Sequence, residues 1–297
     1  MESAMSMPFA RDVARAAAST LAIRKGYSDI LALITSSGPW SPAAFAAIDV
    51  AASSDAHVTG CYVDASVRSL RGRDAEPTVM ALLTEIPRAS RDDYDAFSAF
   101  AHARGVHHVS WMCAQRAPAW TMRSMGAWHD LIVLERDLVE PSLLVDILGE
   151  ALLTCRTPCL VLPPRWDKPL SFKRIVIGWN GGIEAARAIH ASLPLAQMAE
   201  QVTILRDSAL TEADEDQQAP PLDPVTYLRG HGVEVSEKVL DASPLTAGKA
   251  MLAESARLCA DCLVMGAYGH ARTRERVLGG ATRHILQHAE IPVLMQH

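Results

Sequence analysis

Four glycines near the C-terminus, with three arginines between them, are the residues of this sequence whose types and spacing best suit chemistry. The segment "MGAYGHARTRERVLGGATRHIL", residues 265–286, contains Gly266, Gly269, Gly279 and Gly280. Glycine lets the main chain turn sharply or approach a ligand closely. The last two glycines directly precede a helix predicted to begin near Ala281, and the free amides of a helix N-terminus bind anions. The pattern therefore predicts a phosphate-binding loop.

Neighbouring residues extend this predicted site. Thr282 offers a hydroxyl donor, and Arg272 could steer phosphates together with Arg274 and Arg276. However, these arginines alternate with Glu275, a pattern that is equally typical of a solvated surface, so both interpretations stay open. Trp179, at the tip of a predicted strand, could stack on a base or belong to the edge of the core.

An alternation of strands and helices must position the loop. In the second half, short apolar runs rich in β-branched residues predict strands at 174–179, 201–207, 233–240, 262–269 and 291–296, separated by helices at 183–193, 223–232, 244–259 and 280–290. In the first half, strands are predicted at 29–35, 57–64, 106–113, 130–137 and 157–164, with helices at 41–53, 94–105, 117–128 and 143–155.

The two halves look like a tandem duplication. "HDLIVLE" in the first half matches "ADCLVMG" in the second, "TPCLVL" matches "IPVLMQ", and the join lies near the proline-containing segment 163–172. We therefore expect an N-terminal extension over 1–27, a first domain over 28–164 and a second over 172–297. Each domain should be a doubly wound five-stranded parallel sheet with helices on both faces. Ligands of such sheets bind at the carboxyl ends of the strands, where the strand order reverses.

The second domain resembles the universal stress protein family. The nucleotide-binding members of that family carry G-x2-G-x9-G-[ST] after the fourth strand, and Gly266, Gly269 and Gly279 fall at its three glycine positions. The resemblance covers residues 28–164 and 172–296. It implies an adenine nucleotide α-hydrolase-like fold and a role in the stress response, with ATP as the expected ligand and magnesium needed at most as its companion. The nucleotide-binding residues expected on this basis are Gly178, Asn180, Met265, Gly266, Gly269, Arg272, Gly279, Gly280, Ala281 and Thr282.

Two residues depart from the pattern of the family. Gly280 stands where the family has serine or threonine, although its backbone amide can still serve. Asn180 stands at the end of the first strand, where by resemblance an acidic residue contacts adenosine. Asparagine keeps an acceptor and loses the charge, so affinity and preference for base and sugar are expected to differ.

The first domain lacks the loop glycines. It places Glu135, Asp137 and Glu140 where anions would sit, and these charges would repel phosphate. We expect this domain to bind no nucleotide and to pack against the second domain as a built-in pseudo-dimer.

Composition narrows the class of protein. The 297 residues are 49% hydrophobic and 21% charged with a net charge of −6, which favours a globular protein and does not favour nucleic acid as a partner. No apolar run approaches the roughly 18 residues that span a bilayer, and no secretory signal is recognised, so a cytoplasmic location away from membranes is expected. The six cysteines are expected to be reduced, with "CADC" at 259–262 structural rather than redox-active.

Catalysis and metal binding have little support in the sequence. His107, His108 and His129 lack the ligand spacing of a metal site, and His284 and His288 lack the acidic residue of an H-E-x-x-H motif. No P-loop or nucleophile elbow is present. We expect no enzyme, with slow incidental ATP hydrolysis as the most that the site would do.

Three functions remain to be compared. The first is a sensor that binds an adenine nucleotide in the second domain as a regulatory ligand. The alternative is a nucleotide-free interaction protein that dimerises through its apolar fifth strands, in which case the glycines would only pack a helix on the sheet. A weaker third is an enzyme of the wider superfamily, such as a nucleotidyl transferase.

Overall fold

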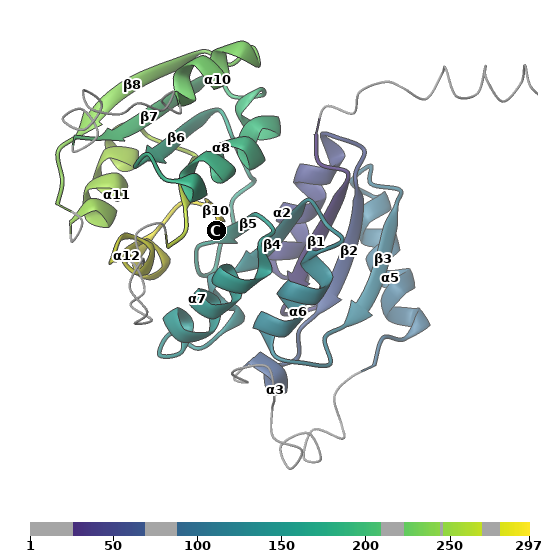
Figure 1. Cartoon of the computed structure of the whole chain (residues 1–297). Helices are drawn as coiled ribbons and strands as arrows, with labels where there is room; N and C mark the ends of the chain where they lie inside the picture. The colour runs from purple at the N-terminus through teal and green to yellow at the C-terminus, as the bar shows by residue number, and fades with distance from the viewer. Residues whose placement is uncertain (1–25, 69–87, 209–222, 244–245, 269–279) are drawn as a thin grey trace, which may run out of the picture.

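The computed structural model describes residues 26–68, 88–208, 223–243, 246–268 and 280–297. All its strands join one continuous ten-stranded sheet in the order β3-β2-β1-β4-β5-β10-β9-β6-β7-β8 (Figure 1). The first half contributes β1 (Asp29–Ile34), β2 (His57–Tyr62), β3 (Val109–Cys113), β4 (Leu131–Glu135) and β5 (Cys159–Leu162). The second half contributes β6 (Arg174–Trp179), β7 (Gln201–Asp207), β8 (Val235–Leu240), β9 (Cys262–Gly266) and β10 (Val293–Gln296).

Helices cover both faces of this sheet. The first half contains α2 (Pro42–Ala52), α3 (Ala65–Arg68), α5 (Arg91–His102), α6 (Pro118–Gly126), the 3₁₀ turn η1 (Arg136–Leu138) and α7 (Leu144–Cys155). The second contains α8 (Ile183–Ala196), α10 (Pro224–Gly230), α11 (Ala247–Arg257) and α12 (Gly280–His288). One core lies under α2, α5, α8 and α10, and the other lies under α3, α6, α7, α11 and α12. Central strands such as β4 are buried along their whole length, as their continuous apolar sequence predicts.

The two halves share one sheet because their fifth strands pair. β5 and β10 run antiparallel, with Leu160 opposite Leu294, whereas the other strand pairs are parallel. Each half therefore contributes a five-stranded parallel sheet, as expected, and the two sheets join edge to edge through this antiparallel pair. The pairing satisfies the backbone groups of both apolar edges inside one chain, so β5 and β10 are not exposed edges through which a second chain could add.

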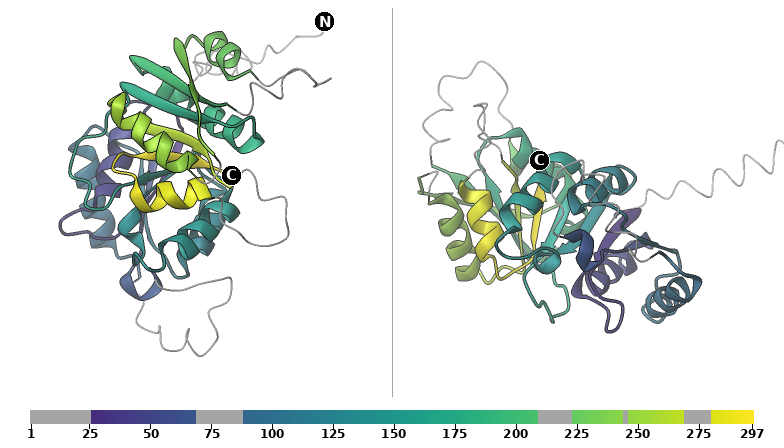
Figure 2. Two further views of the ribbon diagram at one scale, coloured as in Figure 1. Left: turned by 90° about the vertical axis from the view of Figure 1, so that its left-hand side faces the viewer. Right: turned by 90° about the horizontal axis from the view of Figure 1, so that it is seen from below.

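Side chains add further contacts between the halves. Arg136 donates from Nη1 to the carbonyl oxygens of Leu286 at 3.0 Å and Ala289 at 3.1 Å. The Tyr27 hydroxyl donates to the Ala191 carbonyl oxygen at 2.8 Å. Helix α12 packs against both α11 and α7, and the views in Figure 2 show it beside both halves of the molecule. The first half thus holds one flank of the helix that follows the glycine-rich segment.

No helix in the described ranges is both long enough and apolar enough to cross a membrane.

Candidate functional site

The strand order reverses in the second half at β6. This strand pairs in parallel with β7 on one side and with β9 on the other, so the carboxyl ends of all three lie along one edge of the sheet. The adjacency of β6 and β9 confirms the expected switch point, which is where ligands of open α/β sheets bind. A cavity of about 160 Å³ lies at this edge, walled by the ends of β6 to β9 together with α11 and α12.

The cavity brings together the predicted site residues that the structure describes. Its lining includes Gly178, Asn180, Met265, Gly266, Gly280, Ala281 and Thr282. The other three predicted residues, Gly269, Arg272 and Gly279, lie outside the described residues, as do Arg274 and Arg276. Helix α12 begins at Gly280, so its first amides lie at the cavity wall. The N-terminus of this helix supplies the partial positive charge that the glycine pattern predicts.

A turn after β9 ties the strand to α12. Tyr268 has a positive φ of 65°, and its backbone amide donates to Thr282 Oγ1 at 3.2 Å. The amide of Ala267 donates to the Gln296 carbonyl oxygen at 2.8 Å. Thr282 is only 3% exposed, and its hydrogen bond to Tyr268 holds the turn in place. The sequence does not predict this structural role for Thr282. A hydroxyl that accepts one hydrogen bond still has its own proton to donate.

Gly266 is explained by packing. A Cβ atom at this position would lie 2.5 Å from the backbone nitrogen of Ala185, which belongs to the first turns of α8. Only glycine lets that helix approach the end of β9 so closely. Gly178 has a weaker constraint, because a Cβ there would lie 2.7 Å from Sδ of the flexible Met251 side chain. Both glycines shape the cavity by admitting neighbouring elements.

The turn after β6 is a local structure of its own. Asn180 Oδ1 accepts a hydrogen bond from the Gly182 amide at 3.1 Å, immediately before α8. This is a side-chain turn of the kind that asparagine favours, and it fixes the side chain at the cavity wall. The preceding Trp179 is 4% exposed and packs in the core, and it also lines the cavity, so the structure is compatible with both interpretations of this residue.

Sequence reasoning missed several lining residues. They are Leu205, Asp207, Leu240, Ala242, Ala247, Met251 and Tyr268. Asp207 matters most because it brings a half-buried carboxylate to the carboxyl end of β7. The sequence contains a signal for Asp207. Side chains alternate between the two faces of a strand, so residues 205 and 207 of "QVTILRD" lie on the same face, and the carboxyl end of this strand lies at the same edge of the sheet as the cavity. The hydroxyl of Tyr268 is buried, and no hydrogen-bond partner for it lies among the described residues.

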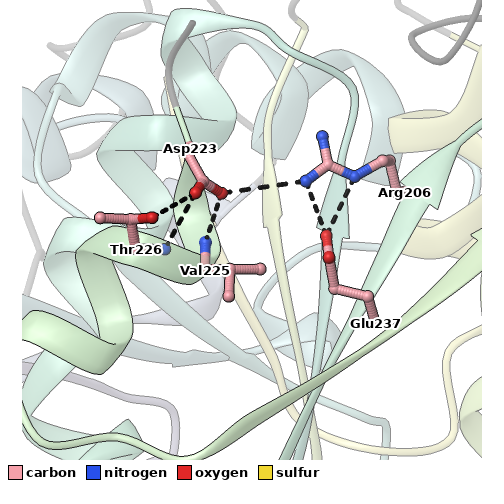
Figure 3. Close-up of polar contacts among 5 residues, drawn as sticks. All are labelled: Arg206, Asp223, Val225, Thr226 and Glu237. Atoms are coloured by element: carbon pink, nitrogen blue, oxygen red, sulfur yellow. Dashed lines mark hydrogen bonds and ion pairs between the residues drawn. The ribbon is translucent and has the colours of Figure 1, made fainter.

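Charged side chains on the opposite face of β7 hold the adjoining helix. Arg206 donates from Nη2 and Nε to Glu237 Oε1 at 2.6 and 3.0 Å, and its Nη2 lies 4.0 Å from Asp223 Oδ1 (Figure 3). Asp223 caps α10 by accepting from the amides of Val225 and Thr226. The group therefore ties the start of α10 to β7 and β8, and it holds the strand that carries Asp207.

The equivalent position in the first half is occupied by a buried carboxylate. Glu135 ends β4 as Gly266 ends β9, it is 4% exposed, and Thr35 Oγ1 donates to it at 3.1 Å. Ser41 and the amide of Ala43, at the start of α2, also hydrogen bond to this side chain, yet burial raises the pKa of Glu135 above its ordinary value. Of the three acidic residues expected to exclude anions, only this one occupies the interior. Asp137 and Glu140 are exposed, and Asp137 instead accepts from the Arg165 amide.

Several histidines in the described ranges have local partners. His129 Nδ1 is 2.8 Å from the Met125 carbonyl oxygen and its Nε2 is 3.0 Å from Thr59 Oγ1, while the rings of His284 and His288 stack 4.3 Å apart. Within the described ranges, no group of three or more His, Cys, Asp or Glu side chains is arranged to hold a metal ion.

Comparison with known proteins identifies the architecture. No protein-family model matches the sequence, and no curated protein matches it either. A universal stress protein from Archaeoglobus fulgidus DSM 4304 superposes with a TM-score of 0.59 at 12% identity, over 90% of this chain and 95% of that one. A putative universal stress protein from Pseudomonas aeruginosa UCBPP-PA14 gives 0.60 at 15% identity, over 92% and 94% of the two chains. The chain therefore has the adenine nucleotide α-hydrolase-like fold of full-length universal stress protein structures, with two α/β halves in one polypeptide.

Proposed function

We propose that this chain acts as a tandem universal stress protein whose second half binds one adenine nucleotide, ATP in the first instance, as a regulatory ligand. The observation that carries the proposal is the cavity at the reversal of strand order, which gathers Gly178, Asn180, Gly266, Gly280 and Thr282 beneath the N-terminus of α12. The sequence alone predicts these residues as ligand contacts. Their convergence at the place where this class of sheet binds ligands favours a ligand site.

The charges around the cavity indicate which end of the nucleotide faces α12 and which end faces Asp207. The N-terminus of α12 favours the phosphates, because its free amides and partial positive charge attract anions. Asp207 and Asn180 lie on the ends of neighbouring strands and offer oxygen acceptors that suit ribose hydroxyls or an exocyclic amine. A carboxylate would repel phosphate, so Asp207 belongs at the nucleoside end. It also restores the negative charge that Asn180 lacks.

The size of the cavity limits what the described residues hold. Its volume of about 160 Å³ lies below the ~300 Å³ at which ordinary ligand pockets begin. The residues that line this cavity would therefore enclose only part of a nucleotide. We propose that the segment 269–279, which contains Gly269, Arg272 and Gly279, adds phosphate contacts to those of the α12 amides. We propose no catalytic role. The ligand would act by occupancy, with magnesium present at most as the companion of ATP.

Calorimetry with the full chain tests the proposal. ATP and AMP should each bind at one site per chain, and tighter binding of ATP would reflect the contribution of the phosphate loop. Gly279→Asp should abolish binding by placing a carboxylate at the phosphate position, whereas Gly230→Asp, at an exposed position with open space around it, should leave binding unchanged. Asp207→Asn should weaken ATP and AMP by the same factor, because it acts at the nucleoside end. Absence of binding at millimolar ATP would refute the proposal.

The small cavity also favours a second candidate, a nucleotide-free interaction protein. In that case the glycines serve only to pack α8, α11 and α12 on the sheet. The fifth strands cannot supply its interface, because they pair with each other. Protein partners recovered with the wild-type chain should then be equally recovered with Gly279→Asp and be unaffected by ATP. Binding of ATP at one site would exclude this reading.

A further inference from the structure

Two buried cysteines lie in contact where the halves of the molecule join. The Sγ atoms of Cys155 and Cys159 are 3.6 Å apart, and their relative exposures are 5% and 0%. Cys155 is the last residue of α7 and Cys159 is the first residue of β5. Both sulfur atoms also lie within 3.4 Å of the Thr157 carbonyl oxygen. The two thiols therefore face each other across a short chain reversal.

Local backbone structure keeps the thiols together. Arg156 has a positive φ of 58°, which turns the chain sharply after α7. Thr157 Oγ1 donates to the Gly126 carbonyl oxygen at 2.7 Å, and Gln296 Nε2 donates to the Arg156 carbonyl oxygen at 3.1 Å. Pairing of β5 with β10 places Cys159 opposite Met295 and fixes the backbone of Cys159. A disulfide, whose S–S bond is about 2.05 Å long, would therefore need only a small shift of the two sulfur atoms.

Of the two cysteines, Cys155 lies at the wall of a groove. Cys155 lines an open groove of about 940 Å³ between the halves, together with Arg123, Arg156 and His190. The hydrogen bond from the Cys159 thiol lowers the pKa of Cys155, while burial raises the pKa of Cys159. Because Cys155 lines the groove and Cys159 is fully buried, Cys155 is the attacking sulfur and Cys159 the resolving one.

Other cysteines in the chain do not share this arrangement. Burial raises the pKa of Cys61 to about 12 and that of Cys262 to about 12, so both thiols stay protonated. Burial also raises the pKa of Cys113. Cys259 is exposed, which makes it the natural reference for unspecific oxidation.

We propose that Cys155 and Cys159 form a peroxide-responsive dithiol, a modification site that converts to an intramolecular disulfide at the junction of the two halves. The Cys155 thiolate attacks one oxygen of hydrogen peroxide and breaks the O–O bond, which gives a sulfenic acid and, after protonation, one water. The Cys159 thiol then attacks that sulfur, and the S–OH bond breaks as the hydroxyl leaves as a second water. Two thiols are oxidised by two electrons and one peroxide is reduced.

Peptide mapping of the full-length protein tests this site directly. The reduced protein is treated with hydrogen peroxide, its free thiols are alkylated under denaturing conditions, and it is digested with trypsin without reductant. Trypsin cuts after Arg136, Arg156 and Arg165, so Cys155 and Cys159 fall on separate peptides, 137–156 and 157–165. The expected result is a linked pair of these peptides that separates on addition of dithiothreitol. The pair should be absent from protein that received no peroxide.

Single substitutions assign the two roles. Cys159→Ser should abolish the linked pair and leave a sulfenic acid on Cys155 that dimedone traps, whereas Cys155→Ser should abolish both products. Cys259→Ser is the matched control and should form the linked pair at the wild-type rate. The proposal is overturned if wild-type protein shows no linked pair at a peroxide dose that oxidises Cys259. It is also overturned if dimedone labels Cys159 in the Cys155→Ser variant.

Discussion

Glu135 and Gly266 end equivalent strands of the two halves, and each meets the N-terminus of the helix that follows the first strand of its own half. Glu135 does so with a carboxylate that reaches the amide of Ala43 at the start of α2. Gly266 does so by having no side chain, so that Glu184 and Ala185 of α8 pack directly on its backbone. The same position thus holds a buried carboxylate in the first half and shapes a cavity in the second.

Gly266→Ala should destabilise the protein because the new methyl group would collide with the backbone of α8. Overpacking of this kind costs about 1–3 kcal/mol of unfolding free energy. Urea denaturation followed by far-ultraviolet circular dichroism measures it. Gly230→Ala is the control, since open space surrounds that position and its φ is not positive. The control should be neutral or stabilising by up to about 1 kcal/mol, and equal effects of the two substitutions would contradict the packing argument.

Glu135→Gln should change how stability depends on pH. Burial raises the pKa of Glu135 above its ordinary value of 4.5 in the folded state, so the folded protein holds this proton more tightly than the unfolded chain does. The stabilisation linked to that proton is fully present below pH 4.5 and is lost as pH rises through the folded pKa. Wild-type protein should therefore lose stability relative to Glu135→Gln between pH 4 and pH 7.

Urea denaturation at both pH values checks this expectation. Glu140→Gln serves as the control because Glu140 is exposed on the same loop and lacks the buried hydrogen bonds of Glu135. A Glu135→Gln difference that is constant with pH would show that the buried carboxylate has an ordinary pKa.

Much of the fold follows from sequence pattern because each apolar run has an unambiguous length and period. "RIVIGW" and "CLVMG" are too short for helices and are bounded by turn signals, and the usual strand order of a doubly wound sheet places them side by side. The adjacency of β6 and β9 confirms this, and it locates the switch point. The predicted ends of the strands were less accurate, since the 262–269 prediction extends past Gly266, where the turn at Ala267 and Tyr268 begins.

Long-range relationships were beyond the same reasoning. "TPCLVL" and "IPVLMQ" read as apolar edges whether they pair with each other or with another chain, because hydrophobicity does not specify a partner strand. Similarly, the constraint on Gly266 depends on the position of α8, which is about eighty residues away in the sequence. Asp207 was overlooked because its strand carries no glycine motif, although its position at the carboxyl end was predictable.

Glu254 should make the protein sensitive to acid through its contacts between β8 and α11. Lys238 Nζ lies 2.5 Å and Arg257 Nη2 2.7 Å from Glu254 Oε1, and these hydrogen bonds lower the pKa of Glu254 from 4.5 to about 2. A depressed pKa contributes stability that is present above pH 4.5 and is lost as pH falls toward 2. The wild-type protein should therefore lose stability over this range more steeply than Glu254→Gln does.

Acid titration of both proteins, followed by circular dichroism, measures the two slopes. Glu200→Gln is the matched control, because Glu200 pairs with Lys173 at 2.9 Å but both side chains are 67% exposed. Solvent screens such surface pairs, so this variant should keep the wild-type slope. Identical slopes for all three proteins would show that Glu254 contributes no linkage.

Arg136→Met should loosen the attachment of α12 to the first half. The arginine donates to the carbonyl oxygens of Leu286 and Ala289 at the end of this helix, where a cation also interacts favourably with the helix dipole. Methionine keeps the apolar stem and removes the donors, which leaves two part-buried carbonyls without this partner and should cost about 1–3 kcal/mol. Amide hydrogen exchange should accelerate more in residues 280–289 than in α8.

Arg123→Met is the control, because Arg123 is exposed on α6, and it should leave exchange in residues 280–289 at the wild-type rate. Equal exchange rates in the two variants would show that packing against α7 and α11 alone holds the end of α12.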